Sequence, residues 1–320
     1  MPSLPFPPPL PDAKAFDVVG VGANAGDHLV RLPRHPEPGE KLRFRAYRHA
    51  GGGQTATALV AVARLGYRVR YLGGVGDDAE GERTLAGLRE EGVDVSRALI
   101  RQGGLTQRAF IIVDDQTGER TILWGRSEGM IVSPEELERE VVTSGRMLHT
   151  DAQQPATSTR AARWAREAGM PVLADLELVR PGTDEFLPEI DILIAGAEFP
   201  EPATGASSPE EAMRILSERT RGGWVMVTEG ARGLALWREG RVERFPAYAV
   251  EAVDTTGAGD VVHGAFAVAC LRGLDLPEAI DFAQAVAAMK CLAAGGRAAI
   301  PRSLEEVERF RRATPHVGGA

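Results

Sequence analysis

The chain has 320 residues, of which 43% are hydrophobic and 26% are charged, and its formal net charge is −8. This composition is typical of a globular protein with a substantial core, and the length allows one large α/β domain or two small ones. Nucleic acid is excluded as a partner, because no region is strongly basic and only 6% of the residues are aromatic. A membrane span is excluded too, since charged and polar side chains interrupt even the richest apolar stretch, 279–294.

The N-terminal segment is rich in proline and has neither the basic start nor the continuous apolar run of an export signal. We therefore expect a stiff, disordered extension over residues 1–15, followed by one folded domain over 16–320. The two cysteines, Cys270 and Cys291, lie in apolar helical patterns, so buried thiols are expected rather than a disulfide. These features predict a cytoplasmic protein.

Short apolar runs alternate with helical periodicities along most of the chain, a pattern typical of a mostly parallel sheet covered by helices on both faces. In chain order, strands are expected at 16–22, 69–73, 147–149, 171–175, 190–194 and 224–228, helices at 54–65, 157–168 and 208–219, and a hairpin over 233–245.

Alternation of a different kind predicts a small antiparallel β lid. Residues 41–48 alternate between basic and apolar side chains, which indicates a half-exposed strand. Two similar runs are joined by the turn signal Asp114–Gly118, so a hairpin is expected there. The lid would consist of segments at about 38–50 and 105–126 inserted into the main domain.

The most informative stretch is Asp254–Asp260, which reads Asp-Thr-Thr-Gly-Ala-Gly-Asp and runs directly into an apolar helical pattern. At a glycine-bearing helix start, backbone N–H groups lack intrahelical partners and can hold an anion. Asp260 places a carboxylate at the same spot, and a base that removes a hydroxyl proton would explain it. A simple helix cap is the alternative, but two glycines and two carboxylates exceed what a cap requires.

Three segments in this order resemble the ribokinase (PfkB) family of sugar and nucleoside kinases: Gly52-Gly53 before a helix, Gly73–Asp78, and Asp254–Asp260. The resemblance implies a ribokinase-like α/β fold with a central, mostly parallel sheet, flanking helices and the β lid. It also implies ATP and Mg²⁺ as cofactors. No lysine follows a glycine, so the Gly-Lys-Ser/Thr phosphate loop of other ATP-binding folds is absent.

By this resemblance, Asp260 takes the proton from the sugar hydroxyl that attacks the γ-phosphate. The backbone amides of Gly257, Ala258 and Gly259 would form the anion hole, because phosphoryl transfer depends on positioning and on stabilising the developing charge.

The resemblance also implies a sugar site. Asp27 matches a family carboxylate that grips substrate hydroxyls, and Gly52 and Gly53 would let the substrate approach the backbone. Thr57 stands where the family usually has a sugar-binding asparagine, which leaves the identity of the sugar open. The residues expected to bind substrate are Asp27, Lys41, Gly52, Gly53, Thr57 and Asp151.

For the nucleotide, Thr228, Gly230 and Gly233 correspond to a family segment that lies against ATP, and Gly257 and Gly259 would border the same ligand.

Two metal assignments follow from the same resemblance. Glu198 is the nearest counterpart of a family glutamate that organises Mg²⁺ through water, although Ala195 replaces the usual asparagine. Asp254 and Thr256 match the region where some members bind a monovalent cation such as K⁺. Alternatively, Asp254 only orients the loop.

Several alternatives stay open at this stage. Residues 51–58 and 295–301 look similar to kinases of sulfonated and phosphorylated ketoses. A neutral sugar is nevertheless the first choice of substrate, because Trp124 and Gln153 occupy positions where an anionic head group would require a cation or an amide. A nucleoside is the runner-up. A non-catalytic sugar-binding sensor is the second alternative, but it would not need Asp260. Whether the lid also pairs two subunits in a homodimer is left open by the sequence.

Overall fold

The computed structural model describes residues 5–117 and 120–318, and within them a nine-stranded sheet forms the centre of the molecule. Its spatial order is β15-β14-β13-β12-β11-β10-β1-β4-β6. The strands are β1 (Val18–Val21), β4 (Val69–Leu72), β6 (Val93–Asp94), β10 (Met147–Thr150), β11 (Val172–Leu176), β12 (Ile192–Gly196), β13 (Trp224–Thr228), β14 (Leu234–Arg238) and β15 (Arg241–Phe245). Pairing is parallel from β6 to β13, and β14 and β15 add an antiparallel hairpin, which confirms the expected mostly parallel sheet.

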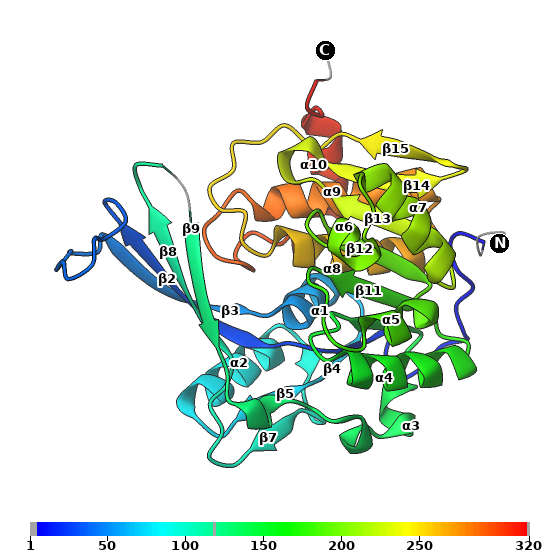
Figure 1. Cartoon of the computed structure of the whole chain (residues 1–320), viewed down its shortest axis with the longest axis horizontal. Helices are drawn as coiled ribbons and strands as arrows, with labels where there is room; N and C mark the ends of the chain where they lie inside the picture. The colour runs from blue at the N-terminus through cyan, green and yellow to red at the C-terminus, as the bar shows by residue number, and fades with distance from the viewer. Residues whose placement is uncertain (1–4, 118–119, 319–320) are drawn as a thin grey trace.

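Helices cover both faces of this sheet (Figure 1). One face carries α1 (Gln54–Arg64), α2 (Ala79–Glu90), α8 (Ala258–Leu271), α9 (Leu276–Lys290) and α10 (Leu304–Ala313). The other carries α3 (Arg139–Val142), α4 (Pro155–Glu167), α5 (Thr183–Phe186), α6 (Pro200–Thr204) and α7 (Pro209–Arg219). Short 3₁₀ turns lie at Glu128–Met130, Pro134–Glu136, Leu187–Glu189 and Gly230–Arg232.

Helix α8 is buried from Val261 to Cys270, because its sequence is apolar on every side and it packs between α1, α9 and the sheet. Gly264 allows the close approach of α1, since a Cβ at that position would overlap the carbonyl oxygen of Ala58. This packing fixes the N-terminus of α8, where the predicted catalytic turn lies.

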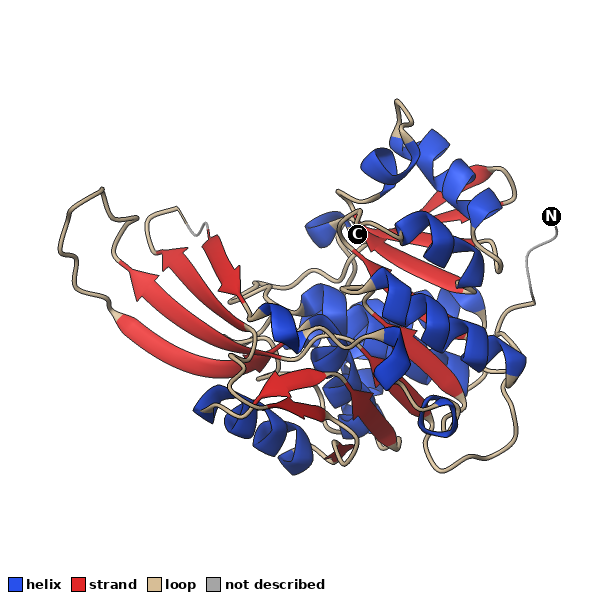
Figure 2. Ribbon diagram, turned by 60° about the horizontal axis from the view of Figure 1, so that its bottom comes forward, coloured by secondary structure: helices blue, strands red, loops and turns tan. Residues whose placement is uncertain are grey.

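A four-stranded sheet projects from one side of the body as the lid (Figures 1 and 2). Its order is β3-β2-β8-β9, and its strands are β2 (Ala25–Leu32), β3 (Ala46–Gly52), β8 (Arg108–Asp114) and β9 (Arg120–Gly125). The outer pairs are antiparallel as expected, whereas the central pair, β2 and β8, is parallel. A separate two-stranded sheet consists of β5 (Gly74–Gly76) and β7 (Leu99–Arg101).

The structure corrects the lid prediction in two places. The strand predicted over 41–48 begins only at Ala46, and Lys41 is exposed in the loop between β2 and β3. This loop lies at the end of the lid that points away from the body (Figure 1). The longest lid strand, β2, was not predicted, because its Ala-Gly-Asp start has low strand propensity. The turn signal Asp114–Gly118 lies partly outside the described residues.

Residues 5–15 differ from the predicted disordered extension. The ring of Phe6 lies 5.6 Å from the ring of Trp224 and 5.7 Å from that of Phe266, so this segment contributes to the core. Burial of an apolar side chain offsets the ordering cost of the segment. Cys270 and Cys291 are buried free thiols, as predicted. Within residues 5–117 and 120–318, none of the helices has the length and apolar character needed to span a membrane.

Candidate active site

The turn before α8 has the geometry of an anion site. Gly257 adopts φ 75°, and a Cβ there would lie 3.0 Å from the carbonyl oxygen of Gly296, so glycine is required for both reasons. The amide of Ala258 donates to the carbonyl of Thr255 at 3.2 Å. Among the described residues, the amides of Gly257 and Gly259 have no protein acceptor, and both can therefore bind a ligand.

Asp260 lies in the first turn of α8, and within the described part of the chain nothing donates a hydrogen bond to its carboxylate. Its pKa is raised well above the usual value by burial, and the negative charges of Asp175 and Glu177 raise it further. An unengaged carboxylate with a raised pKa is suited to accept a proton.

Asp254 holds the turn in place from behind. Its carboxylate accepts from the amides of Thr256 and Gly295, each at 2.8 Å, while the Nζ atom of Lys290 donates to its carbonyl oxygen at 2.7 Å. Burial acts to raise the pKa of Asp254, but the hydrogen bonds from Gly295 and Thr256 prevail and lower it. The carboxylate is thus ionised, and it links the turn to the loop that follows α9.

Asp27 is placed opposite this turn by β2. Burial raises its pKa from 3.8 to about 6, against the lowering influence of Arg297. A Cβ at Gly52 would overlap the Asp27 carboxylate, so the glycine in β3 makes room for it. Gly53 has φ 89° and starts α1 from a conformation that only glycine adopts easily.

Arg297 is a site residue that the sequence did not reveal. Its Nη2 atom donates to the carbonyl of Gly52 at 2.5 Å, and its Nε atom donates to the hydroxyl of Thr57 at 3.1 Å. Burial lowers its pKa to about 10, and the charges of Asp27 and Asp260 oppose that shift. Both carboxylates therefore act electrostatically on the guanidinium. Thr57 is buried, and its hydroxyl supports Arg297 in this position.

A cavity lies at the ends of β1 and β10, and Asp151 is part of its wall. The Asp151 carboxylate already accepts from the amides of Ala23 at 2.6 Å and Gln153 at 3.1 Å and from the hydroxyl of Thr55 at 2.9 Å. Asp151 thus positions the loop after β1. Asn24 in that loop is 2% exposed, and both polar atoms of its side chain lack a partner within the described chain. Its side-chain amide is therefore available to a ligand. In the sequence, the only indication of such a role is the position of Asn24 in the loop after β1.

On the other side of the turn, a larger groove brings together Thr228, Gly230 and Gly233 with Ala258 and Gly259. The predicted nucleotide residues therefore border the anion site directly. Gln284 of α9 also lines this groove, and its buried Oε1 atom has no hydrogen-bond partner among described residues. The C-terminal Val317 closes the groove, because its amide donates to the carbonyl of Ala247 at 2.8 Å.

Carboxylates gather where β11 and β12 end. Asp175 is buried, its pKa is raised well above the usual value by burial and by Glu177, and it accepts a 3.1 Å hydrogen bond from Gln54. Glu177 has a pKa raised by burial, and the charge of Glu198 contributes to the rise. Asp175, which lies within β11, and Glu177, which directly follows it, were both missed in the sequence. Oxygen ligands of this kind suit Mg²⁺. The negative charges of Asp175 and Glu177 also act on Asp260.

The predicted residues thus fall into three groups. Asp27, Gly52, Gly53 and Thr57 lie together where β3 ends and α1 begins, and Asp151 lines the cavity. Gly257, Ala258, Gly259 and Asp260 form the turn, and Thr228, Gly230 and Gly233 line the groove. Lys41 is not brought to any of them.

Comparison with known proteins decides the family. A model of the pfkB family of carbohydrate kinases matches residues 8–303. The chain belongs to this family. This pfkB protein is 30% identical over 295 residues to the ribokinase of Haemophilus influenzae, a match that covers 90% of this chain and 96% of that protein. It is 29% identical over 303 residues to a nucleoside kinase of Methanothermobacter thermautotrophicus, covering 92% and 95% of the two chains.

Solved structures agree with this assignment. Arabidopsis thaliana ribokinase complexed with ribose and ATP has a TM-score of 0.79 to this pfkB protein and is 25% identical, and the match covers 93% of this chain and 99% of that one. Another structure of the same fold contains ATP and Mg²⁺. The expected ribokinase-like fold and the kinase class are confirmed, and the chain is a kinase of the sugar and nucleoside type. The finer resemblance to kinases of sulfonated ketoses stays a prediction.

Proposed function

We propose that this protein transfers the γ-phosphate of ATP to a sugar hydroxyl, with Asp260 as the general base. The observation that carries the proposal is the position of the unengaged Asp260 carboxylate. It directly follows Gly259, which lines the groove, and the charge of Asp27 contributes to its raised pKa. A sensor without catalysis would have no use for such a base.

In the proposed reaction, the substrate hydroxyl gives its proton to Asp260 while its oxygen bonds to the γ-phosphorus. The bond between that phosphorus and the β–γ bridging oxygen breaks, and ADP leaves. The free amides of Gly257 and Gly259 stabilise the charge that develops on the transferred group. Asp27 orients the acceptor by accepting hydrogen bonds from its other hydroxyls.

Mg²⁺ would be held near the phosphates by Glu198 and Glu177, through water, and would neutralise part of their charge. We further propose that a monovalent cation bordered by Asp254 and Thr256 modulates turnover rather than being essential. The ammonium of Lys290 already lies 2.7 Å from the Asp254 carbonyl and supplies positive charge to this loop.

An anionic sugar is the second candidate substrate, favoured by two arginines. Arg126 lines the cavity beside Asn24, and Arg180 donates to Gln153 of the same cavity at 2.9 Å. Burial lowers the pKa of Arg126, and the charge of Arg180 lowers it further. Among the described residues neither arginine forms a carboxylate ion pair, so a phosphate, sulfonate or carboxylate on the substrate would supply the missing counter-charge.

The lid offers a surface for a second copy of the chain. Tyr47, Phe110 and Leu123 lie on one face of the lid sheet and are exposed, which supports the proposed homodimer. The buried free thiols fit the proposed cytoplasmic location. Light scattering of the purified protein tests the dimer directly, and a monomer at micromolar concentration contradicts it.

The function is tested by measuring ADP release with ATP and Mg²⁺ against neutral sugars, sugar phosphates, a sulfonated ketose and nucleosides. Turnover with a neutral or anionic sugar is expected, and the preferred class decides between the two candidates. Turnover with nucleosides alone would replace the sugar assignment. Tight sugar binding without any turnover would favour a sensor and overturn the proposal.

A further inference from the structure

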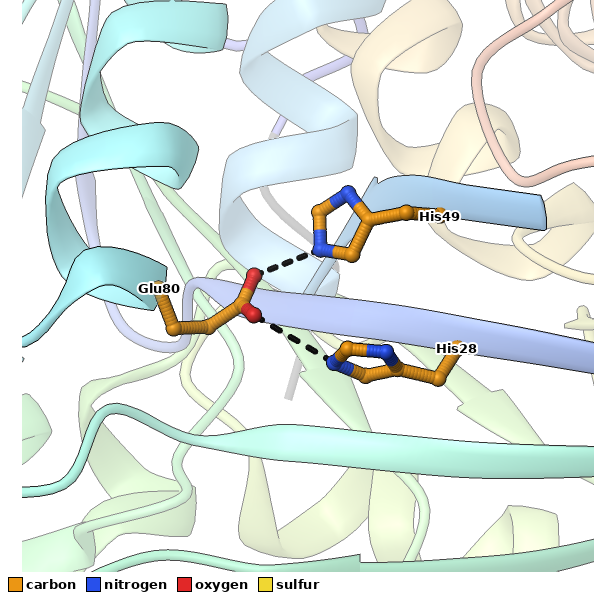
Figure 3. A group of neighbouring side chains, drawn as sticks. All are labelled: His28, His49 and Glu80. Carbon is orange, nitrogen blue, oxygen red and sulfur yellow. Dashed lines mark hydrogen bonds and ion pairs between the residues drawn. The ribbon is translucent and has the colours of Figure 1, made fainter.

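Outside the active site, three metal-ligating side chains converge where the lid joins the body: His28, His49 and Glu80 (Figure 3). His28 and His49 lie directly opposite each other on β2 and β3, whereas Glu80 comes from the first turn of α2. One ring nitrogen of each histidine and a carboxylate oxygen all lie within 4.8 Å of one another. The cluster therefore combines ligands from the lid and from the body.

The distances fit a single bound ion. The Nε2 atom of His49 lies 2.6 Å from one oxygen of Glu80, and the Nε2 atom of His28 lies 3.3 Å from the other. Ligands about 2.1 Å from a tetrahedral metal lie roughly 3 to 3.5 Å from one another, so small side-chain adjustments suffice. The side chains are 15%, 21% and 5% exposed for His28, His49 and Glu80 respectively, which leaves an entry path for an ion.

His28 is already oriented as a metal ligand. Its Nδ1 atom is hydrogen-bonded to the hydroxyl of Tyr47 at 2.8 Å, and its ring stacks on Phe110 with a centroid distance of 4.9 Å. Its Nε2 atom is buried and has no hydrogen-bond partner within the described residues. Metal-bound histidines typically use their second nitrogen in this way, which fixes the ring and the tautomer.

The local backbone makes room for the carboxylate. A Cβ at Gly26, two residues before His28 on the same face of β2, would overlap the Glu80 side chain. Arg83 competes for Glu80, with its Nη1 atom 3.3 Å from the carboxylate, but its side chain is 55% exposed. It can turn into solvent at little cost when a cation arrives.

We propose that His28, His49 and Glu80 bind a divalent transition-metal ion, with Zn²⁺ as the best match, and that the bound ion ties the lid to the body. Two imidazoles and one carboxylate are a known donor set for Zn²⁺, whereas Mg²⁺ and Ca²⁺ prefer oxygen ligands alone. Water would complete the tetrahedron. The site faces away from Asp27, because neighbouring residues of a strand point to opposite faces, and it does not depend on the proposed kinase activity.

The test is metal binding by the full-length protein after treatment with EDTA. Titration with ZnCl₂ in a calorimeter is expected to show one equivalent bound with a dissociation constant in the micromolar range or below. His28→Ala, His49→Ala and Glu80→Gln are each expected to weaken binding by about 100-fold or more, and Tyr47→Phe by about tenfold. His35→Ala is the matched control, since this exposed histidine also belongs to the lid but lies outside the cluster, and it should bind as the wild type does.

Substitution with Co²⁺ gives a second readout that needs no variant. The wild-type protein should show the intense visible bands of tetrahedral cobalt without a sulfur charge-transfer band, because both cysteines are buried elsewhere. Binding that is unchanged in the His28→Ala/His49→Ala double variant would overturn the proposal. So would a wild-type protein that binds no Zn²⁺ at micromolar concentration, or a cobalt spectrum with sulfur ligation.

Discussion

Asp27 carries a stability cost that replacement by asparagine should remove. Its pKa in the folded protein is about 6, above the ordinary 3.8, because the carboxyl is buried. A carboxyl with a raised pKa contributes stability that is complete below 3.8 and is lost as the pH rises through 6. At about 1.4 kcal/mol per pKa unit, the ionised group costs roughly 1 kcal/mol at pH 4.5 and roughly 3 kcal/mol at pH 8.

Urea unfolding of the wild type and Asp27→Asn at both pH values measures this cost. The free energy of unfolding of the variant, relative to the wild type, is expected to increase by about 2 kcal/mol between pH 4.5 and pH 8. Asp12→Asn is the control, because Asp12 is exposed, and its relative stability should stay within about 0.5 kcal/mol at both pH values. A relative stability of Asp27→Asn that does not change with pH would refute the reasoning.

Three further predictions concern the site and its support. Arg297→Gln removes a cation that interacts with Asp27 and Asp260, so the pKa values of both carboxyl groups should rise. The acid limb of the kcat/KM profile should then move up by about one pH unit. A profile that moves equally in Arg297→Lys would argue against a charge effect. Gly264→Ala should destabilise the protein by about 2 kcal/mol in thermal unfolding, because the added Cβ overlaps α1. Gly87→Ala is the control, because a Cβ at Gly87 meets open space, and it should stabilise the protein by roughly 0.5 to 1 kcal/mol. Equal changes in stability for Gly264→Ala and Gly87→Ala would contradict the close packing at Gly264. Glu198→Gln should raise the Mg²⁺ concentration for half-maximal activity by about tenfold at saturating ATP, and an unchanged requirement would exclude Glu198 from the metal site.

The parallel sheet was predictable because its buried strands are short, mostly apolar runs that alternate with helical patterns, as in 171–175 and 224–228. The lid was harder to predict. Its strand β2 contains Gly26 and Asp27, which lower strand propensity, and it forms because β3 and β8 pair with it on either side. Tertiary pairing of this kind leaves no local signal in the sequence.

The turn before α8 could be singled out as a candidate catalytic turn from its glycines and carboxylates, since a helix start with this composition has few other uses. Arg297 was not, because its contacts with Gly52 and Thr57 depend on the loop after α9 returning to the start of α1. The opposite error concerns Lys41. Its positive charge suggested that it binds the substrate. However, Lys41 lies in the loop that joins β2 to β3, and these two long strands separate that loop from the site.

The central claim is that Asp260 accepts the proton of the attacking hydroxyl. Single-turnover transfer of the γ-phosphate to the best sugar of the panel, compared between the wild type and Asp260→Asn, tests it most directly. Asp275→Asn is the matched control, because Asp275 caps the start of α9 and asparagine caps equally well. The account predicts that Asp260→Asn lowers kcat by roughly 10²- to 10⁴-fold with little change in KM, while the control is unaffected. Transfer by Asp260→Asn at the wild-type rate would contradict it.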